Sequence, residues 1–264
     1  MSDIVRVQKG TDAILHVDVQ TAFMGDHAWE GEILRGGGLP VPDGHGIIPA
    51  VLHNSSFFDP SETYASLDMH PTKHVSFASS YAGKAPYDAL TLAEVADRSV
   101  DFSPRILAPH VTTSQLIDYL QNVPDQTQTL WPDHAALGTS EAALHTAMER
   151  PRFAYREVLV KGTDPLCDSY SAVSDNRGRS TGLAGRMWAN GVRRVFLDGL
   201  AYTHCVGWTA LDFAKRGFVV FVIKDATRSV PIPGAEEAMD DALVKAGVHI
   251  ITSAQLAKGG ITKR

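Results

Sequence analysis

Cysteine is nearly absent from this 264-residue chain, which contains only Cys167 and Cys205. Two cysteines in a chain of this length make a poor disulfide framework, and they fit a reducing compartment such as the cytoplasm. No apolar run approaches the length of a membrane span, and the first residues, MSDIVRVQKGTDA, lack the apolar core of a secretion signal. We therefore expect a cytoplasmic protein that does not bind membranes.

The chain also lacks an excess of positive charge. Its formal net charge is −6 and its pI is near 6.0, so a nucleic-acid partner is not expected. No G-x-G-x-x-G motif follows the first expected strand, which speaks against a nucleotide-binding Rossmann protein. Residues of the apolar class make up 44% and charged residues 20%, as in ordinary globular proteins. The sequence leaves the oligomeric state open, a homo-oligomer included.

Short apolar runs alternate with helical patterns along the chain. The expected strands are Ala13–Val17, Thr63–Leu67, Glu157–Val160, Arg194–Leu197, Val219–Ile223 and His249–Ile251. The expected helices lie near Ile47–Asn54, Thr113–Asn122, Ser140–Met148, Thr181–Ala189, Cys205–Arg216 and Glu236–Ala246. This alternation predicts an α/β fold with an open, mainly parallel six-stranded sheet and helices on both faces.

Two irregular stretches interrupt this pattern. Residues 25–46 are rich in glycine and proline, and residues 79–129 are long and polar, with one expected helix. Loops of this length in a compact domain usually line or cover a site. We predict a single domain over residues 1–264 with two functional insertions, because 79–129 is short for a domain of its own.

Three reactive side chains follow expected strands. The first strand ends in HVDVQ, which contains Asp18, and the third reads REVLVKG, which contains Lys161. Cys205 follows LAYTH, where a strand leads into a helix. In an open parallel sheet, ligands bind beyond the carboxyl ends of the strands. A helix N-terminus and a nearby lysine both favour the thiolate form of a cysteine. An aspartate can accept and return a proton, and the turn before the cysteine offers backbone N–H groups to an oxyanion. The three positions therefore indicate acyl transfer by a cysteine nucleophile.

Each of these residues also has an ordinary interpretation. Cys205 could be a small buried apolar residue, Asp18 a turn former and Lys161 a solvated cation. Their joint placement at three strand ends favours the catalytic interpretation. His204 is not assigned as a base, because neighbours in sequence project in different directions.

A metal site is expected beside the thiol. In SLDMHPTKHVSF, Asp68 and His70 are two residues apart, which places both side chains on one face of an extended chain. LWPDHAALGT offers His134 as a third ligand, and fewer than four protein ligands leave positions open for water or substrate. His74 could ligate the metal, bind a metal-bound water or only pack in the loop.

These motifs resemble those of one enzyme family. The segments are HVDVQTAF (16–23), GGGLPVPDGHGIIP (36–49), SLDMHPTKHVSF (66–77), LWPDHAALGT (130–139), VLVKGTDPLCDSYSAV (158–173) and DGLAYTHCVGWTALDFAKRGF (198–218). In their residues and order, they resemble the nicotinamidases (pyrazinamidases) of the isochorismatase-like cysteine hydrolase superfamily.

The resemblance implies roles at matching positions. Cys205 corresponds to the nucleophile, Asp18 to the general base and acid, and Lys161 to the cation that supports the thiolate. The metal ligands would be Asp68, His70 and His134. Zinc is expected first, with iron or manganese as alternatives.

The resemblance also implies a substrate pocket. Phe23 and Trp131 would sandwich the substrate ring, and Tyr170 would line the pocket. The backbone N–H groups of Ala201 and Cys205 would form the oxyanion hole, after a cis peptide bond between Leu200 and Ala201.

The chain departs from the family pattern in three respects. Ala135 stands where many relatives have a second cysteine, and the segment between His74 and Trp131 is longer than in compact members. A further metal ligand would have to be His74 or a residue near Ser79.

The predicted reaction is hydrolysis of nicotinamide to nicotinate and ammonia, in NAD salvage, with pyrazinamide as a further substrate. The alternatives are an amidohydrolase of the same superfamily acting on a ureido or carbamoyl compound, and a non-catalytic ligand-binding relative. A hydrolase of the isochorismatase type, which cleaves a vinyl ether, is disfavoured because such enzymes lack the cysteine nucleophile.

Overall fold

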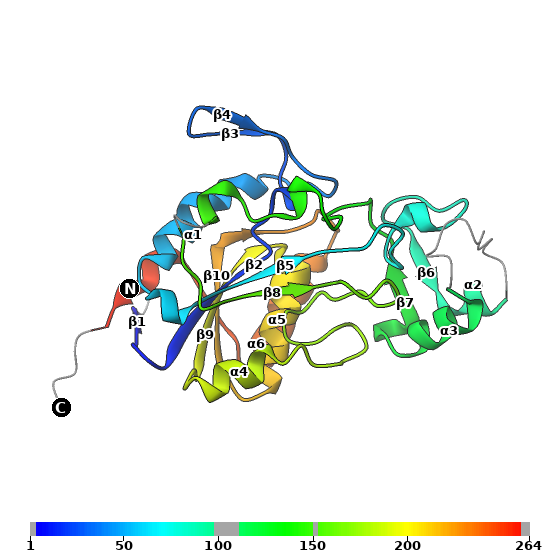
Figure 1. Ribbon diagram of the computed structural model, residues 1–264. Coiled ribbons are helices and arrows are strands. Elements are labelled where there is room, and N and C mark those ends of the chain that lie inside the picture. The colour runs from blue at the N-terminus through cyan, green and yellow to red at the C-terminus, as the bar shows by residue number, and fades with distance from the viewer. Residues whose placement is uncertain (1–3, 98–110, 150–152, 260–264) are drawn as a thin grey trace.

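A six-stranded parallel sheet forms the centre of the molecule (Figure 1). The computed structural model describes residues 4–97, 111–149 and 153–259. The strands, in sheet order, are β11 (His249–Ile251), β10 (Val219–Arg228), β9 (Arg194–Leu200), β2 (Asp12–Val17), β5 (Thr63–Asp68) and β8 (Glu157–Lys161). All neighbouring pairs are parallel, so the predicted α/β sheet is confirmed.

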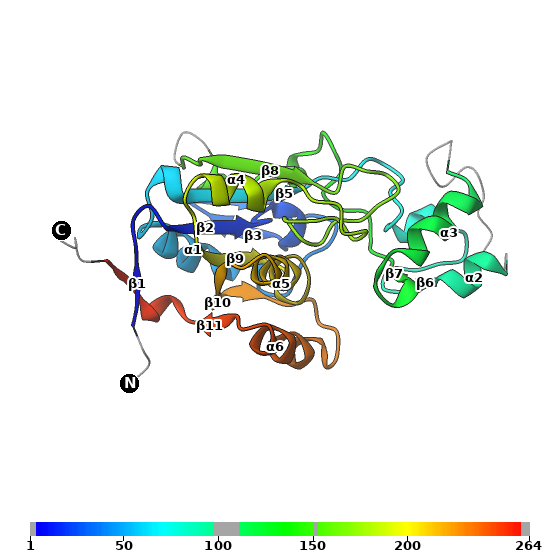
Figure 2. The ribbon, with the colours of Figure 1, turned by 90° about the horizontal axis from the view of Figure 1, so that it is seen from below.

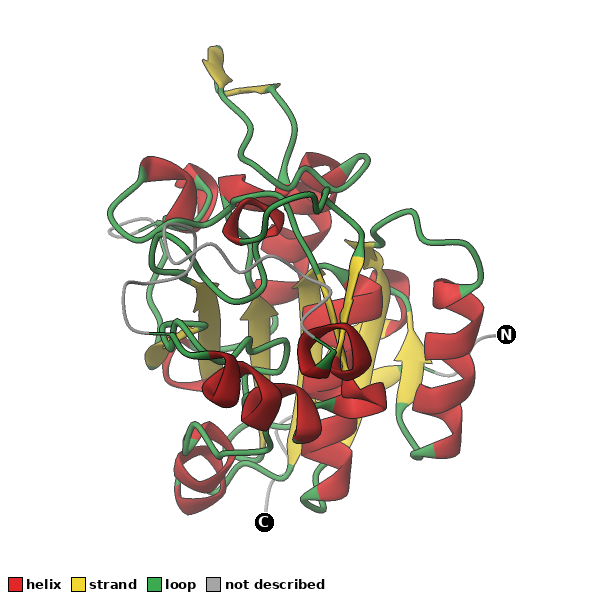
Figure 3. Ribbon diagram, turned by 90° about the vertical axis from the view of Figure 1, so that its right-hand side faces the viewer, coloured by secondary structure: helices red, strands yellow, loops and turns green. Residues whose placement is uncertain are grey.

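Helices cover both faces of this sheet (Figures 2 and 3). Helix α1 (Ile48–Ser55) packs on one face, where its Val51 joins a core with Ile14 and Phe196. The other face carries α4 (Leu183–Ala189), α5 (Gly207–Lys215) and α6 (Ala235–Lys245). Ile14 of β2 lies in the core on the α1 side of the sheet, and its neighbours Ala13 and Leu15 lie in the core on the other side. All six residues of β2 are buried, as expected for a central strand of a parallel sheet that is covered on both faces.

The strand order reverses between β2 and β9. From β2 the chain moves outward to β5 and β8, and from β9 it moves in the opposite direction to β10 and β11. Connections on the two sides of such a reversal diverge, which leaves a crevice beyond the carboxyl ends of the two central strands. The residues that follow β2 and β9 therefore lie where a ligand site is expected.

The two insertions contain more regular structure than the sequence indicated. A hairpin of β3 (His27–Trp29) and β4 (Glu32–Leu34) projects from the body (Figure 1). At one end of the molecule lie β6 (Ala89–Thr91), α2 (Leu92–Ala96), α3 (Thr113–Gln121) and β7 (Thr127–Thr129). In its described residues, this second insertion has its own apolar core and two α-helices, where one was expected.

The predicted helix over Ser140–Met148 is wrong. Two separate 3₁₀ turns, Ser140–Ala142 and Thr146–Met148, flank an extended segment. Leu144 pairs with Gln20 in a β-bridge, and the N–H of His145 donates to the carbonyl of Val19 at 2.8 Å. This tertiary pairing takes the backbone groups that a helix would have used.

The predicted helix from Cys205 begins differently from a standard α-helix. Its first turn, Tyr202–Val206, is π-helical, and α5 follows from Gly207.

A short parallel pair, β1 (Val5–Val7) and β12 (Leu256–Lys258), joins the two ends of the described chain. None of the helices in the described ranges has the length and apolar character of a membrane span.

Candidate active site

The reactive residues meet at the carboxyl edge of the sheet. Asp18 follows β2, Asp68 and Lys161 end β5 and β8, and Cys205 lies in the π-helical turn after β9. Asp18 has a left-handed backbone with φ 47°, and the Oγ of Ser66 donates to its Oδ1 at 2.6 Å. The sequence prediction that the three strand-end residues lie close together therefore agrees with the geometry.

The ammonium group of Lys161 is the centre of the site. Its Nζ lies 2.9 Å from Asp18 Oδ2, 3.1 Å from Asp68 Oδ1 and 3.6 Å from Cys205 Sγ. It also donates to the carbonyl of Ser169 at 2.8 Å, and the residue is only 3% exposed. One buried cation thus links two carboxylates and a thiol.

This arrangement keeps Lys161 charged. Burial by itself lowers the pKa of the lysine, but the two carboxylates outweigh burial and hold that pKa well above its ordinary value. The pKa of Asp18 is raised by burial, against the opposing effect of Lys161. Asp18 is therefore a stronger base than an exposed carboxylate.

The surroundings of Cys205 act on the pKa of its thiol in opposite directions. Burial raises the pKa of its thiol well above the ordinary value, and the neighbouring Lys161 only reduces that shift. Asp18 raises the same pKa further, by its charge and by a hydrogen bond from the thiol. A protonated thiol needs a base at the moment of attack, and Asp18 is in place to be that base.

Asp68, His70 and His134 form a group that fits a metal ion. The Nε2 atoms of the two histidines lie 2.8 Å and 3.5 Å from Asp68 Oδ2, and all three residues are buried. His70 Nδ1 bonds the carbonyl of Gly162 at 3.0 Å, and His134 Nδ1 bonds that of Pro132 at 2.8 Å. These carbonyl contacts favour the proton on Nδ1, so that each Nε2, which faces Asp68 Oδ2, is the atom that could bind a metal ion.

Gly162 is part of this site and was not found from the sequence. It has φ +73°, and a Cβ built there would lie 2.6 Å from Asp68 Oδ1 and 2.8 Å from His70 Cε1. Only glycine lets the backbone pass so close to both side chains. The signal was present in the sequence as the glycine directly after Lys161.

His74 differs from the three ligand candidates. Its Nδ1 lies 2.8 Å from Ser76 Oγ and its Nε2 lies 2.9 Å from the carbonyl of Asp164, so both nitrogens already have partners. Asp168, also missed from the sequence, forms a second possible metal group with His70 and His74. The Oγ of Ser79 donates to Asp133 at 2.5 Å, so this hydroxyl is not directed at the metal group.

A small cavity lies against the thiol. Of the residues predicted from the sequence, the structure brings seven into its wall: Phe23, Asp68, Trp131, His134, Tyr170, Ala201 and Cys205. The ring of Phe23 meets His134 at 5.5 Å, and Trp131 Nε1 donates to Tyr170 Oη at 3.3 Å. The bond between Leu200 and Ala201 is cis, as the resemblance implied.

Leu39, Asp168, His204 and Val230 complete the cavity wall and were not predicted. Leu39 comes from the first insertion, which the sequence predicted to line or cover a site, and Val230 comes from the segment after β10, where no motif was found. Burial lowers the pKa of His204 to about 4, and its ring lies edge-on to Trp131 at 5.0 Å. His204 thus contributes a neutral wall beside the thiol.

A family model and known relatives match this chain over most of its length. The model of the isochorismatase domain matches residues 72–255. The chain belongs to the isochorismatase family. A nicotinamidase from Acinetobacter baylyi is 31% identical to this isochorismatase-family chain over 254 residues, which cover 96% of this chain and 98% of the relative.

Solved structures of isochorismatase-family proteins have the same fold. A nicotinamidase/pyrazinamidase from Acinetobacter baumanii has a TM-score of 0.74 at 28% identity, and the match covers 94% of this chain and 99% of the solved chain. PnC1 from L. infantum, in complex with nicotinate, has a TM-score of 0.68 at 28% identity, with 97% and 100% covered. A pyrazinamidase from Pyrococcus horikoshii in complex with zinc has a TM-score of 0.58 at 26% identity, with 91% and 98% covered.

Proposed function

We propose that this chain is a nicotinamidase, which hydrolyses nicotinamide to nicotinate and ammonia. The observation that carries the proposal is the buried Lys161 ammonium, which joins Asp18, Asp68 and Cys205 beside an aromatic-walled cavity. Relatives at about 30% identity that cover nearly the whole chain are nicotinamidases, which supports the same substrate. Pyrazinamide has one more ring nitrogen than nicotinamide, and it should fit the same walls.

The first half of the reaction forms a thioester. Cys205 Sγ attacks the carboxamide carbon while its proton passes to Asp18, and the negative carbonyl oxygen is bound by the N–H groups of Ala201 and Cys205. Asp18 then donates that proton to the amide nitrogen, the C–N bond breaks and ammonia leaves. Lys161 stabilises the negative charge that moves between Asp18 and Cys205.

The second half consumes one water. Asp18 takes a proton from the water, whose oxygen attacks the thioester carbon and expels the thiolate. The proton returns to Cys205 and nicotinate leaves, so the sum is amide plus water giving acid plus ammonia. The same carboxylate is base and acid in both halves, which suits its position beside Lys161.

Three metal-ligand candidates and two aromatic side chains would orient the substrate. We assign Asp68, His70 and His134 as ligands of one zinc ion, with iron or manganese as alternatives for the same donors. A zinc ion held by these residues would supply a Lewis acid for the pyridine nitrogen of the substrate. Phe23 and Trp131 line the cavity and present apolar faces to the flat ring.

The zinc assignment predicts a metal content that depends on these ligands. Wild-type protein should bind one zinc per chain, and Asp68→Asn should weaken zinc binding by at least about 100-fold, because loss of a ligand costs more than loss of its supporting contacts. Equilibrium dialysis with metal analysis measures both. His74→Asn should keep one zinc per chain, since both His74 nitrogens already have partners. Unchanged zinc affinity in Asp68→Asn would contradict the assignment.

A substrate panel tests the function itself. Wild-type protein loaded with zinc should release ammonia from nicotinamide and pyrazinamide with kcat/KM at least about 100-fold above that for an N-carbamoyl amino acid, because the aromatic residues Phe23 and Trp131 in the cavity wall favour a flat ring over a non-aromatic ureido compound. Product chromatography should show nicotinate in equal amount to ammonia. A preference for the ureido compound, or no release with zinc, iron or manganese, would overturn the proposal.

A further inference from the structure

The cavity beside Cys205 is too small to admit a substrate as it stands. It holds about 30 Å³ of free space, room for about two water molecules, and Cys205 is only 7% exposed. A pyridine ring with a carboxamide is larger than this space. Part of the wall must therefore move before the substrate can reach the thiol.

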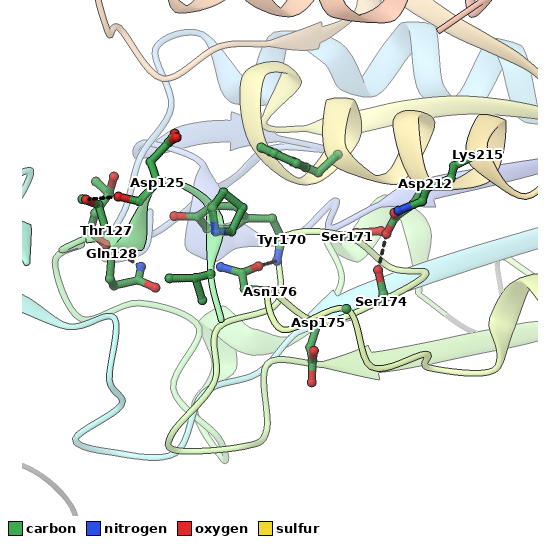
Figure 4. A pocket seen from close by; sticks show the side chains of 15 residues that line it. Asp125, Thr127, Gln128, Tyr170, Ser171, Ser174, Asp175, Asn176, Asp212 and Lys215 are labelled. Carbon is green, nitrogen blue, oxygen red and sulfur yellow. Dashed lines mark hydrogen bonds between the residues drawn. The ribbon is translucent and has the colours of Figure 1, made fainter. Parts of the chain in front are cut away.

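The structure has a second, much larger cavity of about 520 Å³. Figure 4 shows the side chains that line it. Residues 123–129 of the second insertion, loop 170–178 and helix α5 form its walls. The two cavities share a single lining residue, Tyr170. This phenol contacts Trp131, which lines the small cavity, and Gln128, which lines the large one.

We propose that the large cavity is the entry vestibule for the neutral pyridine carboxamide, and that Tyr170 is the gate between it and Cys205. This inference rests on the proposed function. The backbone N–H of Tyr170 donates to Asn176 Oδ1 at 3.1 Å, which anchors the main chain. The phenol is held by side-chain contacts, which are the long 3.3 Å hydrogen bond from Trp131, the contact with Gln128 and an edge-on contact with the His204 ring at 5.4 Å. A turn of the ring would break these contacts and leave the backbone anchor in place.

Four charged residues line the vestibule: Asp125 and Lys215, which are of opposite sign, and Asp175 and Asp212, which are paired within the protein. Asp175 forms an ion pair with Arg179 at 2.6 Å. Asp212 forms an ion pair with Arg216 at 3.3 Å and accepts a hydrogen bond from Ser174. These carboxylates are therefore compensated within the protein. Trp208 of α5 lines the same cavity, and with 38% of the residue exposed it offers a flat apolar surface to a planar ring.

The vestibule assigns a role to the second insertion. Thr127 and Thr129 line the cavity from β7 and are half-buried. A larger side chain at either position would narrow the path without touching Cys205 or the metal ligands. An obstacle on a path slows entry and exit equally and leaves the equilibrium affinity unchanged, whereas damage to the site changes the affinity.

This difference gives the test. In zinc-loaded protein carrying Cys205→Ala, stopped-flow tryptophan fluorescence measures the association and dissociation rates of nicotinamide. Adding Thr127→Phe should slow both rates about tenfold, with Kd unchanged within about twofold. Thr129→Phe is a second variant on the same wall. Gln121→Phe, an exposed position on α3 that does not line the cavity, is the matched control and should leave both rates unchanged.

Two results would overturn the vestibule while leaving the function intact. Unchanged rates in both vestibule variants would mean that the substrate enters elsewhere, for example beside Leu39 and Val230. A weaker Kd with an unchanged association rate would make these residues part of a binding wall and not of a path. If nicotinamide does not bind the Cys205→Ala protein at all, the proposed function fails and the vestibule fails with it.

Discussion

Replacing Cys205 by alanine should lower kcat/KM for nicotinamide by about 10⁴-fold or more, because no other group near the cavity can form the thioester. The nearest side chains, Lys161 and Asp18, are held in an ion pair at 2.9 Å and serve proton transfer. Steady-state ammonia release at saturating zinc measures the loss. Zinc content should stay at one per chain, since Cys205 is not among the metal-ligand candidates.

The other cysteine provides the matched control for this substitution. Cys167 is buried too, and burial raises the pKa of its thiol to about 12, but it packs in the core of the second insertion. Cys167→Ala should keep kcat/KM within about threefold of wild type, at a modest loss of stability for the lost packing. Full activity in Cys205→Ala would show that the thiol is not the nucleophile.

Asp18→Asn should lower kcat/KM by about 10³- to 10⁴-fold, because the amide cannot take the proton of a thiol whose pKa is raised by burial. The substitution preserves side-chain size. The control is Ser66→Ala, which removes the 2.6 Å hydrogen bond to Asp18 but keeps the carboxylate. This substitution should lower kcat/KM only about tenfold. Activity of Asp18→Asn within tenfold of wild type would exclude Asp18 as the base.

The pH dependence of kcat/KM should also depend on Asp18. The base must be ionised, so activity is lost as the pH falls through the pKa of Asp18. Burial raises that pKa, so the loss should begin at a higher pH than an exposed aspartate would give. Asp18→Asn should lack this acidic limb. The comparison is a kcat/KM profile for both proteins across the acidic range.

Much of this site could be predicted from the sequence because parallel strands end at one edge. Asp18, Lys161 and Cys205 each follow an apolar run, and a doubly wound sheet brings such positions together. Period-two alternation likewise placed Asp68 and His70 on one side of the chain after β5. These inferences required only the strand positions, which apolar runs mark clearly.

Other features depend on contacts between distant segments. The pKa of the Cys205 thiol is set by burial among several elements, which outweighs the lysine that the sequence emphasised. Val230 reaches the cavity from a segment with no local signal, and Leu39 reaches it from an insertion in which the sequence singled out no residue. The extended segment at Leu144 exists because Gln20, over a hundred residues earlier, pairs with it. Local pattern carries no information about such pairings.

The central claim is that nicotinamide is hydrolysed through a thioester on Cys205, and trapping with hydroxylamine tests it most directly. Hydroxylamine attacks a thioester in competition with water, so wild-type protein turning over nicotinamide should form nicotinohydroxamate at the expense of nicotinate, in proportion to the hydroxylamine added. Cys205→Ala should form neither product. Nicotinate formation that is undiminished by hydroxylamine, with no hydroxamate, would mean that water attacks the amide directly and would contradict the account.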